Sequence, residues 1–264
     1  MRARVLSTGR RLAALACLTL AATAVSLPAF AAGDVAHPPK LHWSFSGMFG
    51  TFDRAALQRG FQVYKEVCSA CHSMHYLSYR NLTALGFSED EVKAIAAGYE
   101  VQDKEPNDQG EMFKRPGRPS DRFVSPFPNE QAARAANGGA YPPDLSLMIK
   151  AREGGADYVH ALLAAGYQQA PAGVQVPEGK HFNVYFPGNM IAMAPPLNEG
   201  AVTFADGTKS SVHQMASDVA TFLAWAAEPE MEVRKRTGIK VILFLIVLSG
   251  LLYAVKRKVW KGIH

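Results

Sequence analysis

The sequence predicts a mainly α-helical domain with long loops, followed by one C-terminal membrane-spanning helix. Apolar residues recur at three- and four-residue steps over residues 57–68 and 212–226, which is the period of an amphipathic helix, and strand signals are few. Residues 239–255 form an apolar run interrupted only by Lys240, and at about 1.5 Å per residue the run approaches the roughly 30 Å of a bilayer core. The stretch of about 200 residues before it suits one domain of ordinary size.

Two helices of the domain before the apolar run follow directly from this periodicity. The first should begin after Asp53, whose side chain can cap it, and should lead into Cys68. The second should span residues 212–226 and end before Pro229, because proline cannot continue a helix.

A third, shorter helix is expected over residues 144–152, opened by Pro142 and Pro143. Long connections rich in glycine and proline fill residues 105–143 and 166–210. Such connections are expected when a cofactor, rather than a sheet, organises the core.

The N-terminus has the three parts of a secretory signal peptide. Four arginines precede an apolar run over residues 12–27, and the triplet Ala29-Phe30-Ala31 ends in small residues. We therefore expect a signal peptide over residues 1–31. A mitochondrial presequence, also rich in arginine and free of acids, is the alternative.

The C-terminal apolar run is expected to be the membrane anchor. Basic clusters flank it at residues 234–236 and 256–258, which disfavours the alternative of a buried core helix. An exported chain that meets such a segment leaves its C-terminus in the cytoplasm. The predicted organisation is therefore a signal peptide, a periplasmic domain over residues 32–233, and a single-pass anchor with a short tail over 234–264 of the inner (cell) membrane.

Charge is distributed unevenly along the chain. Residues 32–233 hold 16 of the 28 Lys and Arg residues and all 23 Asp and Glu residues, so their net charge is −7 although the whole chain carries +5. An acidic exported domain argues against nucleic acid as a partner and favours a basic one. Acids are densest in residues 100–111, which form either a solvated loop or part of a docking surface for a basic protein.

The cysteines point to a covalently bound haem. Cys17 lies in the leader, so the mature chain keeps only Cys68 and Cys71. A structural zinc site would need further ligands, and a redox dithiol would need a βαβ pattern that is not apparent. Together with His72 the pair matches the haem c attachment motif C-x-x-C-H, in which both thiols bind the haem vinyl groups and the imidazole binds the iron.

The second iron ligand is expected from the loop "FPGNMIAMAPPL", residues 186–197. This apolar loop is bounded by prolines and offers two thioethers, those of Met190 and Met193. A methionine ligand opposite a histidine raises the reduction potential of a haem. A lone methionine more often packs in a core, but a haem that needs a ligand reverses that expectation for this loop.

Several motifs, in this order, resemble those of the cytochrome c1 family: "RGFQVYKEVCSACHSMHYLSYRNL", "GEMFKRPGRPSDRF", "AARAANGGAYPPDLS", "FPGNMIAMAPPL" and "FLAWAAEPEMEVRKRTGIK". The resemblance covers nearly the whole mature chain. It implies a fold like that of class I c-type cytochromes, the axial sulfur at Met193 and a haem-propionate contact at Arg152. It also implies that Asn137, Pro142 and Pro143 lie in the haem pocket.

The same resemblance implies the partners and the reaction. Family members accept electrons from the Rieske iron–sulfur protein, sit beside cytochrome b in the quinol–cytochrome c oxidoreductase complex, and pass electrons to a soluble c-type cytochrome. Such a subunit does no bond chemistry alone. The alternatives are a tethered cytochrome that serves another oxidase or reductase, and a haem sensor with an open iron position.

Overall fold

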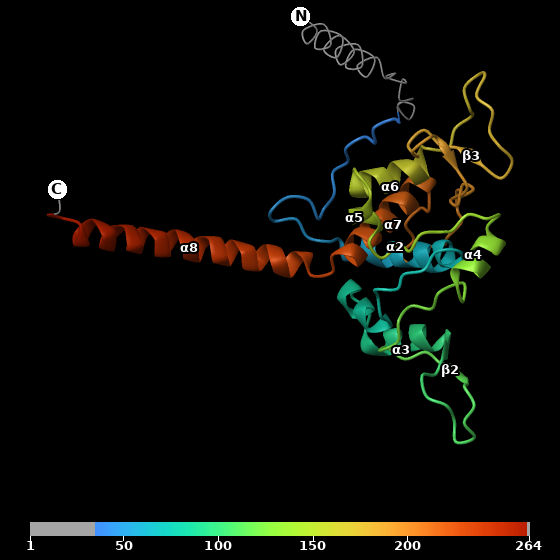
Figure 1. Ribbon diagram of the computed structural model, residues 1–264, viewed down its shortest axis with the longest axis horizontal. Coiled ribbons are helices and arrows are strands. Elements are labelled where there is room, and N and C mark those ends of the chain that lie inside the picture. The colour runs from blue at the N-terminus through green and yellow to red at the C-terminus, as the bar shows by residue number, and fades with distance from the viewer. Residues whose placement is uncertain (1–34, 263–264) are drawn as a thin grey trace, which may run out of the picture. The chain divides into compact units, whose positions relative to one another are not determined.

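The computed structural model describes residues 35–262 of the chain (Figure 1). The signal peptide expected over residues 1–31 lies outside this range, as does Cys17. The α-helices of the described part are α2 (Arg54–Glu66), α3 (Glu89–Ala97), α4 (Glu130–Ala136), α5 (Met148–Ala151), α6 (Gly155–Ala164), α7 (Val212–Ala227) and α8 (Met231–Val259). Two 3-10 helices, η1 (Cys68–Ala70) and η2 (Tyr79–Leu85), complete the helical content.

Strands in the described part are short and form two antiparallel pairs. The first pair joins β1 (Glu100–Gln102) to β2 (Lys114–Pro116), and the second joins β3 (His181–Phe182) to β4 (Met190–Ile191). The prediction of a mainly α-helical domain with long loops is therefore confirmed.

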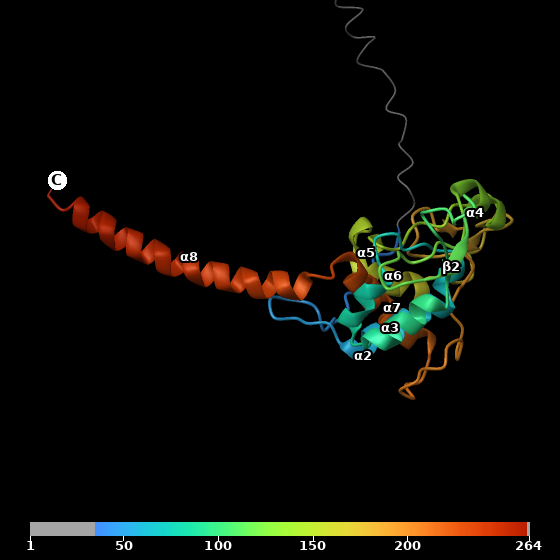
Figure 2. The same cartoon turned by 90° about the horizontal axis from the view of Figure 1, so that it is seen from below.

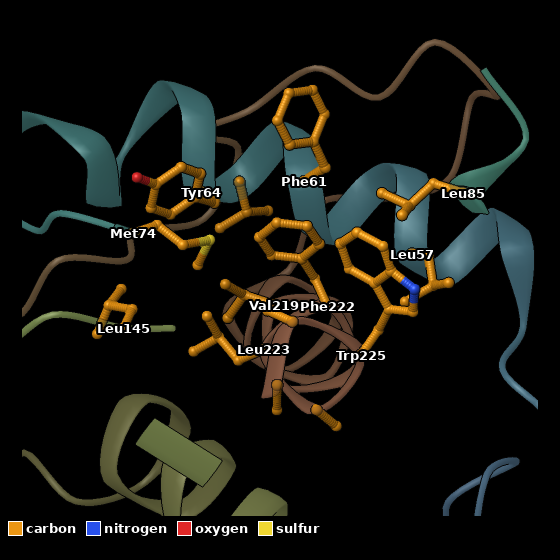
Figure 3. Packing of buried hydrophobic residues seen from close by; sticks show 14 of the residues in the cluster. Leu57, Phe61, Tyr64, Met74, Leu85, Leu145, Val219, Phe222, Leu223 and Trp225 are labelled. Carbon is orange, nitrogen blue, oxygen red and sulfur yellow. The ribbon is translucent and has the colours of Figure 1, made fainter. Parts of the chain in front are cut away.

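The core forms where α2 and α7 pack against each other. Figure 3 shows α7 end-on with α2 running across it, and the apolar side chains of both helices meet between them. The Phe222 ring lies 5.8 Å, between centroids, from the rings of both Phe61 and Tyr64. Leu57 is fully buried, and Trp225 is 1% exposed. All of these except Trp225 belong to the two predicted stripes, so the periodicity identified the central helix pair correctly.

A side-chain cap fixes the start of α2, and an ion pair fixes how α2 meets α7. The Asp53 side chain accepts hydrogen bonds from the amides of Ala55 and Ala56, which confirms it as the cap of α2. Halfway along α2, Arg59 donates to both carboxylate oxygens of Asp218 on α7 at 2.8 and 3.0 Å. Asp218 is 1% exposed, so this pair is a buried, bidentate ion pair that fixes the register of the two helices.

The third predicted helix was wrong in its extent. Residues 144–147 are not helical, and α5 spans only Met148–Ala151. The Asp144 carboxylate accepts a hydrogen bond from the amide of Ser146 at 2.8 Å, and this local turn competes with a helix start. The helix α6, which the periodicity did not predict, begins at Gly155 with Gly154 as its N-cap, and both of these glycines adopt positive φ.

The C-terminal helix α8 continues without a break from Met231 through the basic residues 234–236 and the apolar run. Over its most apolar stretch the mean hydropathy is 2.4 and none of the residues is buried in the described part of the chain. Tyr253 and Trp260, near the far end, are also exposed, as expected for residues at a membrane interface. Length and composition therefore support a single transmembrane helix.

Candidate haem site

The two cysteines and the histidine lie on one tight turn that directly follows α2. Cys68 opens the 3-10 helix η1, and its carbonyl accepts hydrogen bonds from the amides of Cys71 at 3.1 Å and His72 at 2.9 Å. Both cysteines are free thiols. Burial, together with the neighbouring Cys71, raises the pKa of the Cys68 thiol to about 12, whereas a redox-active dithiol has a lowered pKa. The turn therefore presents two thiols and one imidazole together.

The His72 ring is held by a residue 71 positions away in sequence. Its Nδ1 lies 2.8 Å from the carbonyl oxygen of Pro143. A carbonyl can only accept, so Nδ1 carries the proton and Nε2 keeps its lone pair free for a metal ion. Burial lowers the pKa of His72, which favours the neutral ring that metal ligation requires. Such a bond to the second nitrogen is the usual way in which proteins orient a ligating histidine.

Asp144, which no sequence motif marked as a site residue, holds the same two segments together. One of its carboxylate oxygens accepts hydrogen bonds from the Ser73 hydroxyl at 2.9 Å and the His75 amide at 2.8 Å. The other accepts from Ser146. Burial raises the pKa of Asp144, but the hydrogen bonds from Ser146, His75 and Ser73 outweigh burial and leave it below its ordinary value. Asp144 therefore fastens the segment after the cysteine motif to the segment after Pro143.

A cavity of about 300 Å³ opens beside the motif. Cys71 and Pro142, two of the predicted site residues, both line it, although they are far apart in sequence. The rest of its wall comes from residues 125–130 together with Ser73, His75, Ala133 and Tyr141. The structure thus brings the cysteine motif and the two prolines together.

The roles of Asn137 and Arg152 in the haem pocket remain predictions. The Asn137 side chain donates to the carbonyl of Ala133 at 2.7 Å and so closes the end of α4. Arg152 is exposed, and its guanidinium donates to the carbonyl of Ala151 at 3.0 Å. Within residues 35–262, neither side chain forms a hydrogen bond to the motif at residues 68–72.

The two candidate methionines differ in their backbone setting. Met190 lies in β4, paired with Phe182, whereas Met193 follows that strand in irregular backbone. The Tyr167 hydroxyl donates to the carbonyl of Met193 at 3.0 Å. Tyr167 lies just after α6, so this bond ties the Met193 backbone to the helical part of the domain. Tyr167 was not among the site residues predicted from the sequence.

Hydrogen bonds of Asn183 and Asn189 stabilise the loop that leads to these methionines. Asn183 is fully buried; its side chain donates to the carbonyl of Leu162 on α6 at 3.0 Å, and its amide donates to the carbonyl of Asn189 at 2.8 Å. Asn189 has φ of 59°, the only positive φ at a non-glycine residue in the described part. Asparagine tolerates this left-handed conformation better than most residues, and its side chain bonds back to the carbonyl of Val184 at 3.2 Å. The loop is therefore held firmly on both sides of its turn.

These residues fit a covalently bound haem c. Two free thiols and a neutral imidazole with a free Nε2 lie on one turn, and a thioether lies on a braced loop. This set combines the attachment groups of haem c with a histidine and a methionine, the ligand pair found in cytochromes c.

Comparison with known proteins supports the same conclusion. A family model described as the cytochrome C1 family matches residues 43–263. The cytochrome c1 of Rhodospirillum rubrum is 50% identical over 240 residues, which cover 85% of this chain and 88% of that protein. A protein of Solanum tuberosum named cytochrome c1-2, heme protein, mitochondrial, is 54% identical over 220 residues, which cover 83% of this chain and 84% of that protein.

A third relative is longer than this chain. The cytochrome b/c1 of Bradyrhizobium diazoefficiens is 52% identical over 248 residues, which cover 86% of this chain but only 36% of that protein. The predicted family, the mainly α-helical fold of a class I c-type cytochrome with one C-terminal membrane helix, and haem c as the family's cofactor are confirmed. The chain therefore belongs to the cytochrome c1 family, whose members are haem-bearing electron-transfer subunits of the cytochrome bc1 complex.

Proposed function

We propose that this chain binds one haem c through Cys68 and Cys71 and passes single electrons from the Rieske iron–sulfur protein to a soluble, basic c-type cytochrome. The Nε2 atom of His72 and the sulfur of Met193 would be the two protein ligands of the haem iron. The observation that carries the proposal is the hydrogen bond from His72 Nδ1 to Pro143, because it frees Nε2 for iron directly beside the two thiols.

Each residue of the site has a physical task in this proposal. The bound haem supplies an iron that gains and loses one electron. The Pro143 carbonyl fixes the His72 tautomer and ring plane, and Asp144 keeps the segments on both sides of that bond together. Asn137, Pro142 and Arg152 are proposed to contact the haem, with Arg152 facing a propionate. The methionine ligand keeps the potential higher than a second histidine would.

The proposed setting is the cytochrome bc1 complex of an inner membrane, beside cytochrome b and the Rieske subunit. Helix α8 crosses the lipid once, with the haem domain in the periplasm and the C-terminus in the cytoplasm. The signal peptide proposed over residues 1–31 supports this orientation, because it requires export of everything before the anchor.

Ion pairs within the hairpin of β1 and β2 reduce the number of acidic residues available to a basic acceptor. Of the acids in residues 100–111, Asp103 is half-buried and forms an ion pair with Arg115 at 2.7 Å, and Glu100 forms an ion pair with Lys114 at 3.5 Å. Both pairs lie within the hairpin itself. Glu105, Asp108 and Glu111 are exposed and have no ion-pair partner within residues 35–262. These three residues are therefore the ones proposed to steer a basic cytochrome.

The axial ligand is tested by two matched substitutions, Met193→Leu and Met190→Leu. Each keeps size and apolarity and removes only the sulfur. Met193→Leu should retain covalent haem but lower the reduction potential sharply and nearly stop turnover of the complex, because the electron from the Rieske protein would then move uphill. Met190→Leu should change neither property. Loss of the sulfur-ligated spectrum in the Met190 variant alone would reverse the assignment, and carbon monoxide binding to the reduced unmodified protein would favour the haem sensor.

The acceptor surface is tested by Glu105→Gln, Asp108→Asn and Glu111→Gln in one variant. The variant should reduce a basic cytochrome c more slowly at low salt, and its rate should depend less on ionic strength. Lys104→Gln, in the same loop, is the control of opposite charge and should not slow the reaction. Identical rates for the triple variant and the unmodified protein at all salt concentrations would show that this loop is only solvated.

A further inference from the structure

A loop of uncharged residues lies just before α2 and exposes two large apolar side chains. Residues 43–52 contain no charged side chain. At the tip of this loop Met48 is 60% exposed, and Phe49, at 80%, is the most exposed large apolar residue in the described part of the chain. Gly47 and Gly50 flank them, and the positive φ of Gly47, 72°, turns the chain at the tip. We call residues 46–50 the apolar tip.

The apolar tip is fastened to the start of the membrane helix. The Lys235 ammonium on α8 donates to the carbonyls of Phe45 at 2.7 Å and Gly50 at 3.2 Å, one on each side of the tip. Just before it on α8, the Glu232 carboxylate accepts from the amide of Phe52 at 2.8 Å. In both Figure 1 and Figure 2 the blue segment before α2 lies alongside the first turns of α8.

This attachment sets the height of the tip relative to the lipid. Lys235 precedes Ile239, the first residue of the apolar run, by four positions, which is about 6 Å along a helix axis. The headgroup layer on each side of a bilayer is of similar thickness, about 5–8 Å. The backbone beside Lys235 is therefore at the level of the headgroups, and apolar side chains at the tip can reach the acyl boundary.

We propose that the apolar tip inserts Met48 and Phe49 into the outer boundary of the bilayer, as a second membrane contact beside α8. The chemistry favours lipid as the occupant. The tip itself has no charge to desolvate, and the basic residues Arg234, Lys235 and Arg236 at the same level suit anionic headgroups. A single helix leaves a domain free to rotate about its axis, whereas a second contact fixed to that helix restrains the haem domain above the membrane.

The experiment places tryptophan at the tip. The full-length chain, with Trp260→Phe to remove the tryptophan at the far end of α8, is assembled in nanodiscs of phosphatidylcholine and phosphatidylglycerol. Phe49→Trp should lose at least half of its added fluorescence when the lipid is brominated near the top of the acyl chains. Met112→Trp, an exposed residue on the loop between β1 and β2, is the control and should not be quenched. Equal quenching at both positions, or none at position 49, would overturn the proposal.

A second measurement applies to the native membrane. A photo-crosslinking phenylalanine analogue at position 49 should form adducts with lipid, and the same analogue at position 112 should not. An adduct between position 49 and a protein subunit, in place of lipid, would mean that another subunit covers the tip and would overturn the assignment of lipid as its occupant.

Discussion

Replacing Gly60 by alanine should weaken the packing of the central helix pair. An alanine Cβ at this position of α2 would lie 2.1 Å from the carbonyl oxygen of Asp218 on α7, whereas ordinary contacts begin at 3.4 Å. The helices would have to separate locally by the difference, about 1.3 Å. Alanine is the better helix former by about 1 kcal/mol, but overpacking costs about 1–3 kcal/mol or more, and backbone atoms cannot rotate away. We expect a net loss of about 2 kcal/mol.

Thermal unfolding of the purified full-length haem protein in detergent, followed by the haem absorbance, measures this loss. For a domain of this size, about 2 kcal/mol corresponds to a decrease in Tm of about 4–8 °C. Gly238→Ala is the matched control, because Gly238 also lies within a helix, but a Cβ added there would meet no atom within 4 Å. An unchanged or higher Tm for the Gly60 variant would refute the close approach of α2 and α7.

Three other changes test separate parts of the structure. Arg115 holds the pKa of Asp121 at about 2, below the ordinary 3.8, so Asp121→Asn should lower the free energy of unfolding at neutral pH by about 1 kcal/mol, because water screens this pair near the surface. In denaturant titrations the difference in unfolding free energy between the two proteins should shrink as the pH falls from about 4 to about 2. A difference independent of pH would contradict a stabilising role of the Asp121 charge. Tyr167→Phe removes the hydrogen bond to the Met193 carbonyl, worth about 1 kcal/mol, so added imidazole should displace the methionine ligand about fivefold more readily. Equal imidazole affinity would show that Tyr167 does not position the ligand. A chain that ends after Thr237 should be released from the membrane and keep its free energy of unfolding. A chain that ends before Met231 should also be released, but its free energy of unfolding should fall by about 3 kcal/mol, because Met231 is buried and Glu232 binds the Phe52 amide. Retention of either product in the membrane pellet without partner subunits would contradict the anchor assignment.

Local sequence patterns predicted the helices that carry the core. The stripes in α2 and α7 consist of residues that face each other, so a 3.6-residue period was enough to find them. The membrane helix was predictable for a similar reason, since a long apolar run between two basic clusters is typical of a membrane span. Helix α3 also has a local signal, the capping box of Ser88 and Glu91, which apolar periodicity does not reveal.

The contacts that assemble the site could not be predicted from local sequence patterns. Asp144 looked like the first residue of a helix, but its carboxylate binds Ser73 and His75, about 70 residues earlier. Nothing in the residues around Asp144 encodes these partners. Likewise, the motif predicted His72 as a ligand, but the orientation of its ring depends on the Pro143 carbonyl, and a carbonyl has no signature in sequence. The chemistry of the site was predictable from its motif, and the bonds that position it required the fold.

The proposed function depends above all on one haem held covalently by Cys68 and Cys71. Trypsin should cut after Lys65 and Arg80 and release both cysteines on a single peptide, residues 66–80. Mass spectrometry of this peptide from the purified membrane protein should show the mass of one haem added through both thiols. In a variant with both cysteines changed to serine, little stable haem protein should remain. Recovery of the peptide from the unmodified protein with two free thiols, or with a disulfide and no haem, would contradict covalent attachment.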